Sequence, residues 1–465
     1  LHTLYWKALF SPENLSNVVY KLNGEAEVFY RKASIAETDK VVHKANEPIK
    51  NKDVHTEKET SVFEYDLVKD KRYTVDKYQF HVPITMNFQA QGENYMNRKV
   101  NQMIHDNKGI HVIGIDRGER NLLYLTLVDP EGRIIKQMSL NEIISYDKQN
   151  RKHVKNYHDL LDVREKENKS DRQNWKTVNT IKELKEGYLS QVIHVITKLM
   201  VEYNAIVVLE DLNSGFMRGR QKFEKQVYQK FEKMLIDKLN YCVDKTINPE
   251  QSGGLLHAYQ LTKRFDSFKK LGKQSGFLFY IPAWNTSKMD PTTGFVNLFY
   301  VKYESVDKTK EFIKKFDSIS YNSERFYFEF AFDYSKFTYK ADGTRLHWTI
   351  CTHGERIENF RNPEKNNEWD SRKITLTTAW KELLEKFEID YTQKNLIDQM
   401  LQCNDTEFFK SFMRYFRLIL QMRNSDAKTG EDWICSPVMN EHGKFYFSGE
   451  ESTLPLDADA NGAYN

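Results

Sequence analysis

Two short apolar runs, each ending in acidic residues, constrain the fold of this chain more than any other feature. HVIGID (111–116) ends at Asp116, and AIVVLED (205–211) carries Glu210 next to its end. Runs of this length and composition are typical of buried strands. Because side chains at the carboxyl ends of neighbouring strands meet at one edge of a sheet, we expect Asp116 and Glu210 to lie close together.

The elements around these two runs indicate the order of the fold. NLLYLTLVD (121–129) and RIIKQMSL (133–140) follow the first run after tight turns, which predicts an antiparallel meander of three strands. Hydrophobic periodicity predicts helices at about 156–176, 180–203 and 222–243, and a further strand at 277–282. With 205–211 as a central parallel strand, this is the order of an RNase H-like domain, and the fold class is α/β with α+β parts.

Residues 284–456 do not continue this pattern and predict an inserted α+β domain. In FYFEFAFDY (326–334), Phe326, Phe328, Phe330 and Phe332 alternate with other residues, which is typical of a half-buried strand. Helices are expected in WKELLEKF (380–387) and in FFKSFMRYFRLILQMRN (408–424). The chain then returns to the first domain at DADANGAYN (457–465).

The N-terminal part of the chain, to about residue 84, is predicted to be rich in short strands. VVYKLNGEAEVFYRKASI (18–35) holds an Asn-Gly turn between two apolar-rich runs, which indicates a hairpin. The polar, Lys-rich stretch 37–60 is expected to be a surface loop, and SVFEYDLVKDKRY (61–73) returns to strand-like alternation.

Composition excludes some classes of protein but does not select a function. The chain of 465 residues exceeds what one core usually serves, so two or three domains are expected, and a net charge of +3 neither demands nor excludes nucleic acid. The sequence has no run of about 18 apolar residues, so it predicts no membrane span. The cysteines form no CxxC pair, which argues against zinc and favours a reducing compartment; they are Cys242, Cys351, Cys403 and Cys435.

A third acid completes a candidate metal site. Asp459 opens the last predicted helix, from which its carboxylate can reach the edge that carries Asp116 and Glu210. Three adjacent carboxylates repel one another unless cations hold them, and Mg²⁺ prefers oxygen ligands. Two such ions, about 4 Å apart, suit phosphodiester hydrolysis. Taken singly, an Asp after a strand is more often a turn residue, and Glu210 can be the neighbour of a helix cap.

Long stretches of the chain resemble one known family. IDRGERNLLYLTLVD, VVLEDLNSGFMRGR and DADANGAYN are similar to the three split RuvC motifs of the type V, subtype A, CRISPR effector nucleases. The resemblance implies that Asp116, Glu210 and Asp459 are the catalytic acids and bind two Mg²⁺ ions, with Mn²⁺ able to replace them. It also implies a guide-RNA-directed enzyme of the prokaryotic cytoplasm that cuts both strands of target double-stranded DNA and then degrades single-stranded DNA nonspecifically.

The same resemblance implies a division of the chain. The expected parts are a wedge or oligonucleotide-binding segment that binds and processes the guide-RNA handle (1–84), RuvC part I (85–155), a bridge helix (156–176), RuvC part II (177–283), an inserted nuclease-lobe domain (284–456) and the start of RuvC part III (457–465). The family's recognition lobe is expected before Leu1 and the close of its RuvC domain after Asn465. The chain is therefore expected to be a fragment.

Further site residues follow from the resemblance. The stretch 212–225 matches a lid over the cleavage site, whose cations would neutralise phosphate; they are Arg218, Arg220, Lys222 and Lys225. Arg423 matches an arginine that the family places near the cut, where a guanidinium grips phosphate through a bidentate fork. Without the family, the lid is a solvated loop and Arg423 complements the dipole of a helix end.

A second chemistry is implied in the N-terminal segment. His43, Lys52 and Lys69 match positions that trim precursor guide RNA without metal, with the imidazole moving a proton and the ammonium groups stabilising phosphate. Tyr73 is expected to stack a base, and Trp175 to anchor the bridge helix in the recognition lobe. The alternative is that a His and Lys in a polar loop are ordinary surface residues.

Two other functions and one loop remain to be weighed. An actin-like or sugar-kinase ATPase begins with a similar Asp-containing hairpin, but it needs a second glycine-rich phosphate hairpin, which this sequence lacks. A catalytically silent RNA-binding scaffold is the other alternative. SKMDPTTGF (287–295) resembles a zinc-ribbon loop without its cysteines, so we expect a structural turn and no zinc.

Overall fold

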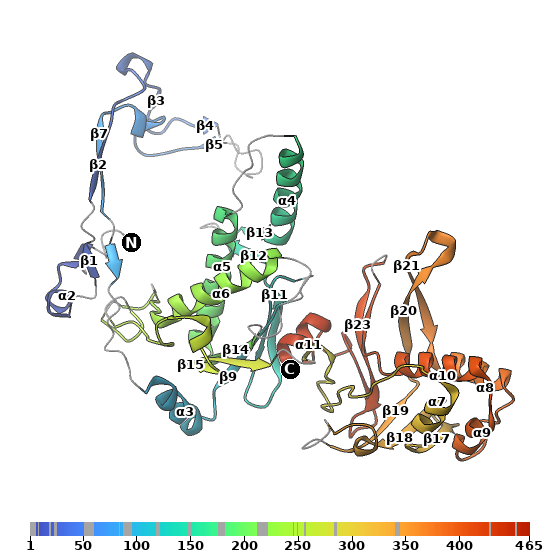
Figure 1. Ribbon diagram of the computed structural model, residues 1–465. Coiled ribbons are helices and arrows are strands. Elements are labelled where there is room, and N and C mark those ends of the chain that lie inside the picture. The colour runs from blue at the N-terminus through green and yellow to red at the C-terminus, as the bar shows by residue number, and fades with distance from the viewer. Residues whose placement is uncertain are drawn as a thin grey trace. The chain divides into compact units, whose positions relative to one another are not determined.

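The computed structural model separates into two units. One comprises Leu1–Gly92 and Val243–Tyr259, and the other comprises Glu93–Cys242 and Gln260–Asn465 (Figure 1). The residues that the structure describes are 6–7, 9–17, 20–22, 26–50, 60–82, 84–86, 95–117, 121–146, 151–174, 182–211, 222–244, 246–248, 250–254, 257–282, 286–339, 345–426, 429–451 and 453–465. Of the described helices, none combines the length and apolar character that crossing a bilayer requires.

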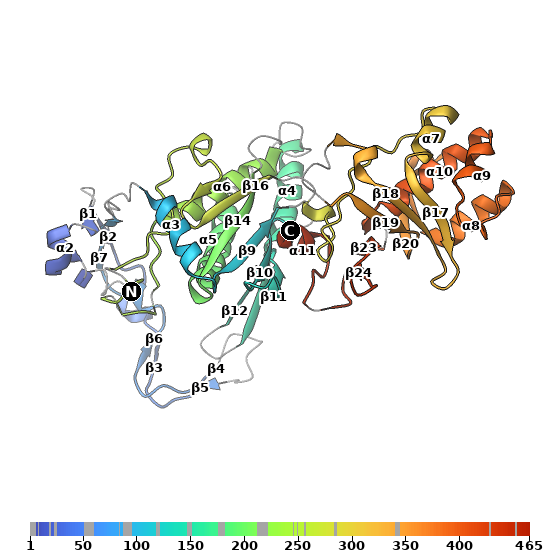
Figure 2. The ribbon, with the colours of Figure 1, turned by 90° about the horizontal axis from the view of Figure 1, so that it is seen from below.

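A six-stranded mixed sheet forms the core of the larger unit (Figure 1, Figure 2). Its strands, in spatial order, are β11 (Ile134–Ser139), β10 (Tyr124–Val128), β9 (His111–Asp116), β14 (Ala205–Asp211), β16 (Leu278–Pro282) and β15 (Gln274–Ser275). The first three are antiparallel, whereas β14 is parallel to both β9 and β16. The predicted meander and the central parallel strand are therefore confirmed.

Helices cover this sheet and connect its strands. They are α3 (Met96–Asp106), α4 (Tyr157–Gln173), α5 (Lys182–Glu202), α6 (Lys222–Asn240) and α11 (Ala458–Tyr464), and a ribbon of β12 (Glu142–Tyr146) and β13 (Lys152–Asn156) precedes α4. Leu189, Val192 and Ile196 recur at helical spacing along α5 and are fully buried against the sheet. The helices predicted from periodicity are thus confirmed to within a few residues at each end.

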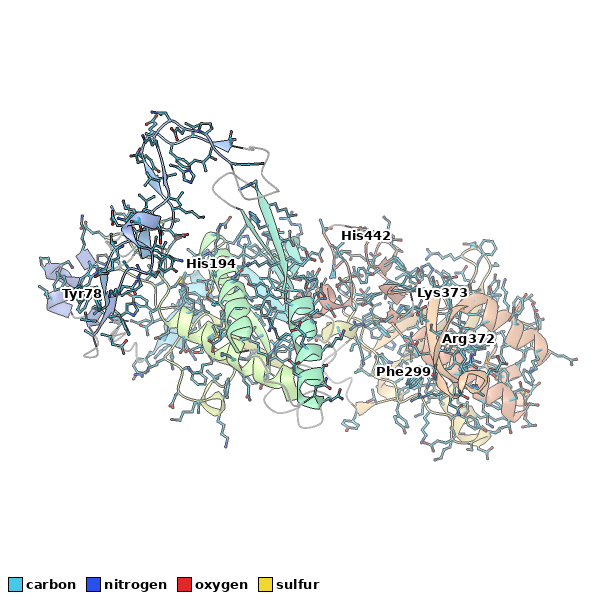
Figure 3. The ribbon with its side chains drawn as sticks, turned by 90° about the horizontal axis from the view of Figure 1, so that it is seen from above. Tyr78, His194, Phe299, Arg372, Lys373 and His442 are labelled. Atoms are coloured by element: carbon cyan, nitrogen blue, oxygen red, sulfur yellow. The ribbon has the colours of Figure 1, made fainter. Side chains whose placement is uncertain are left out.

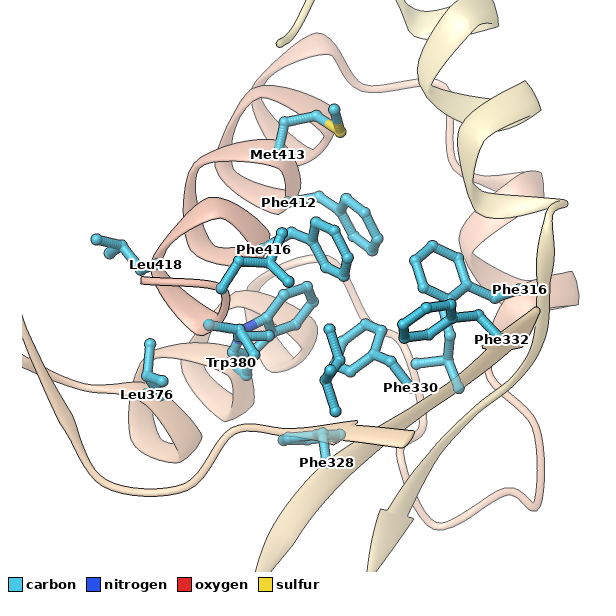
Figure 4. Packing of buried hydrophobic residues seen from close by; sticks show 14 of the residues in the cluster. Phe316, Phe328, Phe330, Phe332, Leu376, Trp380, Phe412, Met413, Phe416 and Leu418 are labelled. Carbon is cyan, nitrogen blue, oxygen red and sulfur yellow. The ribbon is translucent and has the colours of Figure 1, made fainter. Parts of the chain in front are cut away.

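The inserted region has its own sheet and its own core. β17 (Phe316–Asn322), β18 (Tyr327–Asp333) and β19 (His347–Cys351) form the sheet, and α7 (Val306–Ile313), α8 (Leu376–Lys386), α9 (Ile397–Gln402) and α10 (Thr406–Ile419) pack with it. Figure 4 shows Phe330 of β18 facing Trp380 and Phe416, with ring centroids 5.1 and 5.6 Å away. Edge-to-face aromatic packing of this kind stabilises the core beyond the area that it buries.

One prediction in this core is wrong at its first residue. Phe328, Phe330 and Phe332 are buried as the alternation predicted, but Phe326 is 70% exposed. Its φ of 60° places it in the turn before β18, where the side chain no longer follows the alternation of the strand. A pattern with a period of two continues by chance into a turn, and the sequence has no signal that marks the boundary.

Two further ribbons complete the inserted region. β20 (Glu355–Asn362) pairs with β21 (Glu368–Thr375), on which Figure 3 labels Arg372 and Lys373, and β22 (Arg423–Ser425), β23 (Asp432–Met439) and β24 (Phe445–Phe447) form the other. The helix predicted over 408–424 instead ends at Ile419, and Arg423 begins a strand. Arg423 is therefore not a helix-end residue that complements a dipole.

The smaller unit consists of short strands paired over long sequence separations. Its elements are α2 (Pro12–Asn17), β1 (Tyr20–Leu22), β2 (Glu27–Arg31), β3 (Val42–His43), β4 (Ile49–Lys50), β5 (Thr60–Ser61), β6 (Leu67–Val68), β7 (Lys77–His81) and β8 (Ile84–Met86). The pairs are β1 with β8, β2 with β7, β3 with β6, and β4 with β5. The loop predicted at 37–60 thus contains strands, and the strand expected at 61–73 is reduced to short pieces.

The hairpin predicted at 18–35 is wrong. Its two arms, β1 and β2, pair with β8 and β7 instead of with each other. Across the β2–β7 pair, the rings of Tyr30 and Tyr78 lie 5.2 Å apart, and those of Phe29 and His81 lie 4.8 Å apart. These cross-strand ring pairs contribute to the long-range pairing that the structure has in place of the predicted hairpin.

Candidate active site

Asp116 is the last residue of β9 and Glu210 the next-to-last residue of the parallel strand β14, and the two lie at the same level. Ile115 of β9 is paired with Leu209 of β14, so the two acids follow directly after paired residues. Each is 8% exposed. The predicted pairing of the two strands, and the meeting of their acids at one sheet edge, is therefore confirmed.

Helix α11 brings Asp459 to this edge because two glycines permit a very close approach. A Cβ atom on Gly114 of β9 would lie 1.8 Å from the carbonyl oxygen of Ala463 in α11. A Cβ atom on Gly462 would lie 2.8 Å from Cγ of Asp116. The N-cap Asp457 accepts a hydrogen bond of 2.8 Å from the amide of Ala460 and so fixes the start of the helix.

The three acids act on one another electrostatically. Burial, together with the charges of Glu210 and Asp459, raises the pKa of Asp116 to about 7, although the backbone amide of Arg117 and the charge of Arg423 oppose the shift. Carboxylates that share a buried site resist ionising together. The arrangement therefore holds excess negative charge that a cation would relieve.

Neutral donors hold two of the acids in place. The hydroxyl of Thr286 donates to Oε1 of Glu210 over 2.6 Å. The amide of Asn121 donates to Oδ2 of Asp459 over 2.5 Å, and its own Oδ1 accepts hydrogen bonds from Ser139 and Asn141. Sequence reasoning missed Asn121 and Thr286, because neither has a spacing signal and each lies in a turn or short helix.

Arg423 reaches the site from the inserted region. Its Nη2 lies 3.5 Å from Oδ1 of Asp459 and 3.3 Å from Oδ2 of Asp432, whose side chain is 3% exposed. The guanidinium thus links a strand of the inserted region to the acid on α11. The structure brings Arg423 to the carboxylates, as the resemblance implied, although from a strand and not from a helix.

The donor set suits a hard divalent cation, although the carboxylates do not converge on one point. Among the described residues, no group of three His, Cys, Asp or Glu side chains is arranged to hold a single metal ion. Mg²⁺ needs only one or two carboxylates and completes its shell with water and phosphate. A cavity of about 150 Å³ lies between α11 and the sheet, and Glu210 is among the residues that line it. The oxygen donors of Asp116, Glu210 and Asp459 are thus of the chemical kind that Mg²⁺ binds.

Several residues predicted for the lid, the bridge-helix anchor and RNA processing lie wholly or partly outside the described residues. Arg218, Arg220, Lys52 and Trp175 lie outside the described residues. Lys222 and Lys225 belong to the first turns of α6, but their side chains lie outside the description. The roles of all six stay predictions.

Two of the residues predicted to process RNA, His43 and Lys69, lie at one short ribbon. His43 of β3 pairs with Leu67 of β6, and the amide of Lys69 donates to the carbonyl of Val41 over 2.9 Å. Lys69 therefore lies one residue beyond the end of β6, on the segment next to β3. The ring of Tyr73 lies under two guanidinium groups, those of Arg31 at 5.0 Å and Arg72 at 4.6 Å.

The loop expected as a structural turn is held by one acid. Asp290 is fully buried, and its Oδ1 accepts hydrogen bonds from Thr292 and Thr293. Its Oδ2 accepts a 2.5 Å hydrogen bond from Ser436 of β23. The loop follows β16 in the chain, and the hydrogen bond from Ser436 ties it to β23 of the inserted region. This is the structural role predicted for it.

Comparison with known families agrees with this geometry. Residues 90–465 match the RuvC nuclease domain family. The match covers the six-stranded sheet, the inserted region and all three acids, and it implies hydrolysis of phosphodiester bonds in nucleic acid. This chain belongs to the RuvC nuclease domain family.

Proposed function

We propose that Asp116, Glu210 and Asp459 form the catalytic centre of an RNA-guided DNA endonuclease. The observation that carries this proposal is the meeting of three buried acids from distant parts of the chain, with the pKa of Asp116 raised to about 7 by burial and by the other two. A buried carboxyl group whose pKa is raised by burial and by neighbouring acids is typical of functional sites.

Each residue has a defined part in this centre. Asp116 and Glu210 present oxygen ligands from adjacent strands, and α11 presents a third from Asp459. Two Mg²⁺ or Mn²⁺ ions, when bound, would lower the pKa of the attacking water and neutralise charge on the leaving oxygen. Thr286 and Asn121 orient Glu210 and Asp459, and the Arg423 guanidinium can exchange a carboxylate for substrate phosphate.

The guide-directed part of the proposal is supported by the sequence. The three motif stretches, together with the residues of the wedge, bridge-helix and nuclease-lobe segments, resemble the type V, subtype A, CRISPR effectors. We therefore propose guide RNA as a partner, cleavage of both strands of target DNA, and nonspecific cleavage of single-stranded DNA afterwards. The nuclease-family match speaks against the ATPase alternative, and metal-dependent cleavage would exclude a silent scaffold.

The catalytic proposal is tested in the full-length, guide-loaded enzyme. Asp116→Ala is expected to abolish cleavage of target DNA in Mg²⁺ while leaving the dissociation constant for guide RNA unchanged. Asp237→Asn serves as a matched control, because this exposed acid on α6 forms its ion pair with Lys233 and not with a residue of the proposed centre. Wild-type cleavage by Asp116→Ala would refute the assignment.

We also propose that the ribbon carrying His43 and Lys69 trims precursor guide RNA without metal. The two residues lie on neighbouring segments of the ribbon, which suits a combination of proton transfer by the imidazole with phosphate stabilisation by the ammonium group. Arg31 and Arg72, gathered around Tyr73, add positive charge in the same unit. Tyr73 can stack a base after one guanidinium moves aside.

An assay with precursor RNA in the presence of a chelator measures this activity separately from metal-dependent DNA cleavage. With EDTA present, the wild type is expected to trim precursor RNA, and His43→Ala is expected to leave it uncut. DNA cleavage by His43→Ala with mature guide should match the wild type. His105→Ala, which removes an exposed histidine on α3, is the control. Unchanged trimming by His43→Ala would reject the role of His43.

A further inference from the structure

A second concave site lies at the β15 edge of the sheet, two strands away from the strand that carries Glu210. Its volume is about 600 Å³. Asn97 of α3 lines one side, and residues between Lys263 and Ser275 line the rest. None of the acids of the proposed catalytic centre contributes to it, so it requires a separate explanation.

The lining of this cavity is strongly basic. Lys263, Arg264, Lys270 and Lys273 face one acid, Asp266, which forms a 2.6 Å ion pair with Lys270. Within the described part of the chain, no carboxylate lies within ion-pair distance of the other three cations, all of which are exposed. Positive charges gathered in a concave surface focus their field and attract anions.

The backbone that carries these cations is held rigidly. Phe265 and Phe268 pack against the main core, with ring centroids 5.0 Å apart. The side chain of Asn97 donates to the carbonyl of Gln274 over 3.0 Å and accepts from the amide of Gly276 over 2.8 Å. A backbone anchored at these points does not have to be ordered on binding, which removes one part of the entropy cost.

Glycine at position 276 closes the base of this loop. Its φ of +62° favours glycine, and a Cβ atom there would lie 2.2 Å from the carbonyl oxygen of Leu261. The amide of Phe277 donates to the same oxygen over 2.8 Å. The loop therefore leaves and rejoins the core at one point, and its shape is a fixed feature of the fold.

We propose that this basic cavity binds successive phosphates of a nucleic-acid backbone, outside the catalytic centre. Lysine ammonium groups act as point charges, which suits contact with phosphate regardless of base. The described lining residues include no aromatic ring on which a base would stack, so the site reads backbone and not sequence. The proposal rests on membership of a nuclease family, but it does not depend on the assignment of the catalytic acids.

Charge reversal tests this site in the full chain. Lys263→Glu combined with Lys273→Glu is expected to weaken binding of fluorescein-labelled DNA about tenfold at roughly 100 mM salt, measured by anisotropy. The slope of log K against log salt should fall in magnitude by about 2, since two phosphate contacts are lost. Lys198→Glu with Lys394→Glu, on exposed parts of α5 and the inserted region, is the matched control.

The experiment uses single-stranded DNA, duplex DNA and RNA of one sequence. A selective loss of affinity for one of the three supports the proposal and identifies the kind of nucleic acid that the cavity binds. Unchanged affinity for all three overturns the proposal. Lys263→Gln with Lys273→Gln, which alters the surface less, should give an intermediate loss if thermal melting shows an intact fold. Failure of the catalytic assignment would appear separately, as cleavage that survives Asp116→Ala while the binding defect persists.

Discussion

Asn121 and Asp459 are joined by a 2.5 Å hydrogen bond from the amide of the first to Oδ2 of the second. Asn121 follows β9 in the meander, whereas Asp459 belongs to α11. Oδ1 of Asn121 accepts from the hydroxyl of Ser139 over 2.5 Å, so the sheet fixes the amide and the amide fixes the acid. The position of Asp459 is thus set by the sheet as well as by its own helix.

Removing this amide should impair catalysis without unfolding the protein. Asn121→Ala is expected to lower the cleavage rate about 10- to 100-fold and to raise the Mg²⁺ concentration needed for half-maximal activity, because residues behind metal ligands affect metal affinity to that extent. Ser139→Ala should give a smaller loss of the same kind. A metal titration of cleavage rate measures both. An unchanged Mg²⁺ requirement in Asn121→Ala, with Asn404→Ala as the exposed control, would reject this positioning role.

Two glycines are predicted to respond in opposite ways to substitution by alanine: Gly114, where β9 contacts α11, and Gly187, on α5. Gly114→Ala is expected to destabilise the protein by about 2 kcal/mol, since its methyl group would overlap the backbone of Ala463 and force α11 away. Cleavage should fall as Asp459 moves with the helix. Gly187→Ala, on α5, meets nothing within 4 Å and should stabilise by up to about 1 kcal/mol. Urea denaturation measures both, and equal stability of the two variants would contradict this packing.

Arg423 is predicted to serve both the acid on α11 and the substrate. Arg423→Ala should lower DNA cleavage about 10- to 100-fold, because the guanidinium that reaches Asp459 is removed. Arg423→Lys should recover only part of the rate, because an ammonium group can replace the single nitrogen that approaches Asp432 and Asp459 but cannot grip phosphate through a bidentate fork. Single-turnover cleavage at saturating guide is the measurement. Full activity of Arg423→Lys would show that charge alone suffices.

The parts of the site that could be predicted from sequence are those set by strong local patterns. Apolar runs identified β9 and β14, and the parallel pairing of such strands places Asp116 and Glu210 at one edge. Asn121 could not be found in this way, because its partner lies far along the chain and a turn asparagine has many ordinary roles. Positioning contacts of this kind depend on tertiary structure and have no periodic signature.

Boundaries between elements were the least predictable features of the fold. The apolar periodicity of α10 continues past its end at Ile419, so the sequence places Arg423 on the helix, although it begins β22. In the smaller unit, the local signal of an Asn-Gly turn is overridden by aromatic pairs between β2 and β7. In each case, a contact with a distant segment determines the outcome, and local propensity does not.

Glu358 links the β20–β21 ribbon to helix α10. Its side chain is 8% exposed and pairs with Arg372 at 2.8 Å and with Arg414, which contacts both of its oxygens. Burial by itself raises the pKa of Glu358, but hydrogen bonds and charges from Arg414 and Arg372 outweigh burial and hold the pKa below its ordinary value. The carboxylate is therefore stabilised in the folded state.

Because the folded pKa of Glu358 is lowered, its contribution to stability is fully present above the ordinary glutamate pKa of about 4.3 and disappears as the pH falls through the lowered value. Glu358→Gln is expected to reduce the free energy of unfolding by about 2 kcal/mol at pH 7, since two arginines lose their buried partner. The difference between wild type and variant should stay constant down to about pH 4.5 and shrink below it. Paired urea denaturation from pH 7 to pH 3 measures this difference, and a gap that widens in acid would contradict the direction of the shift.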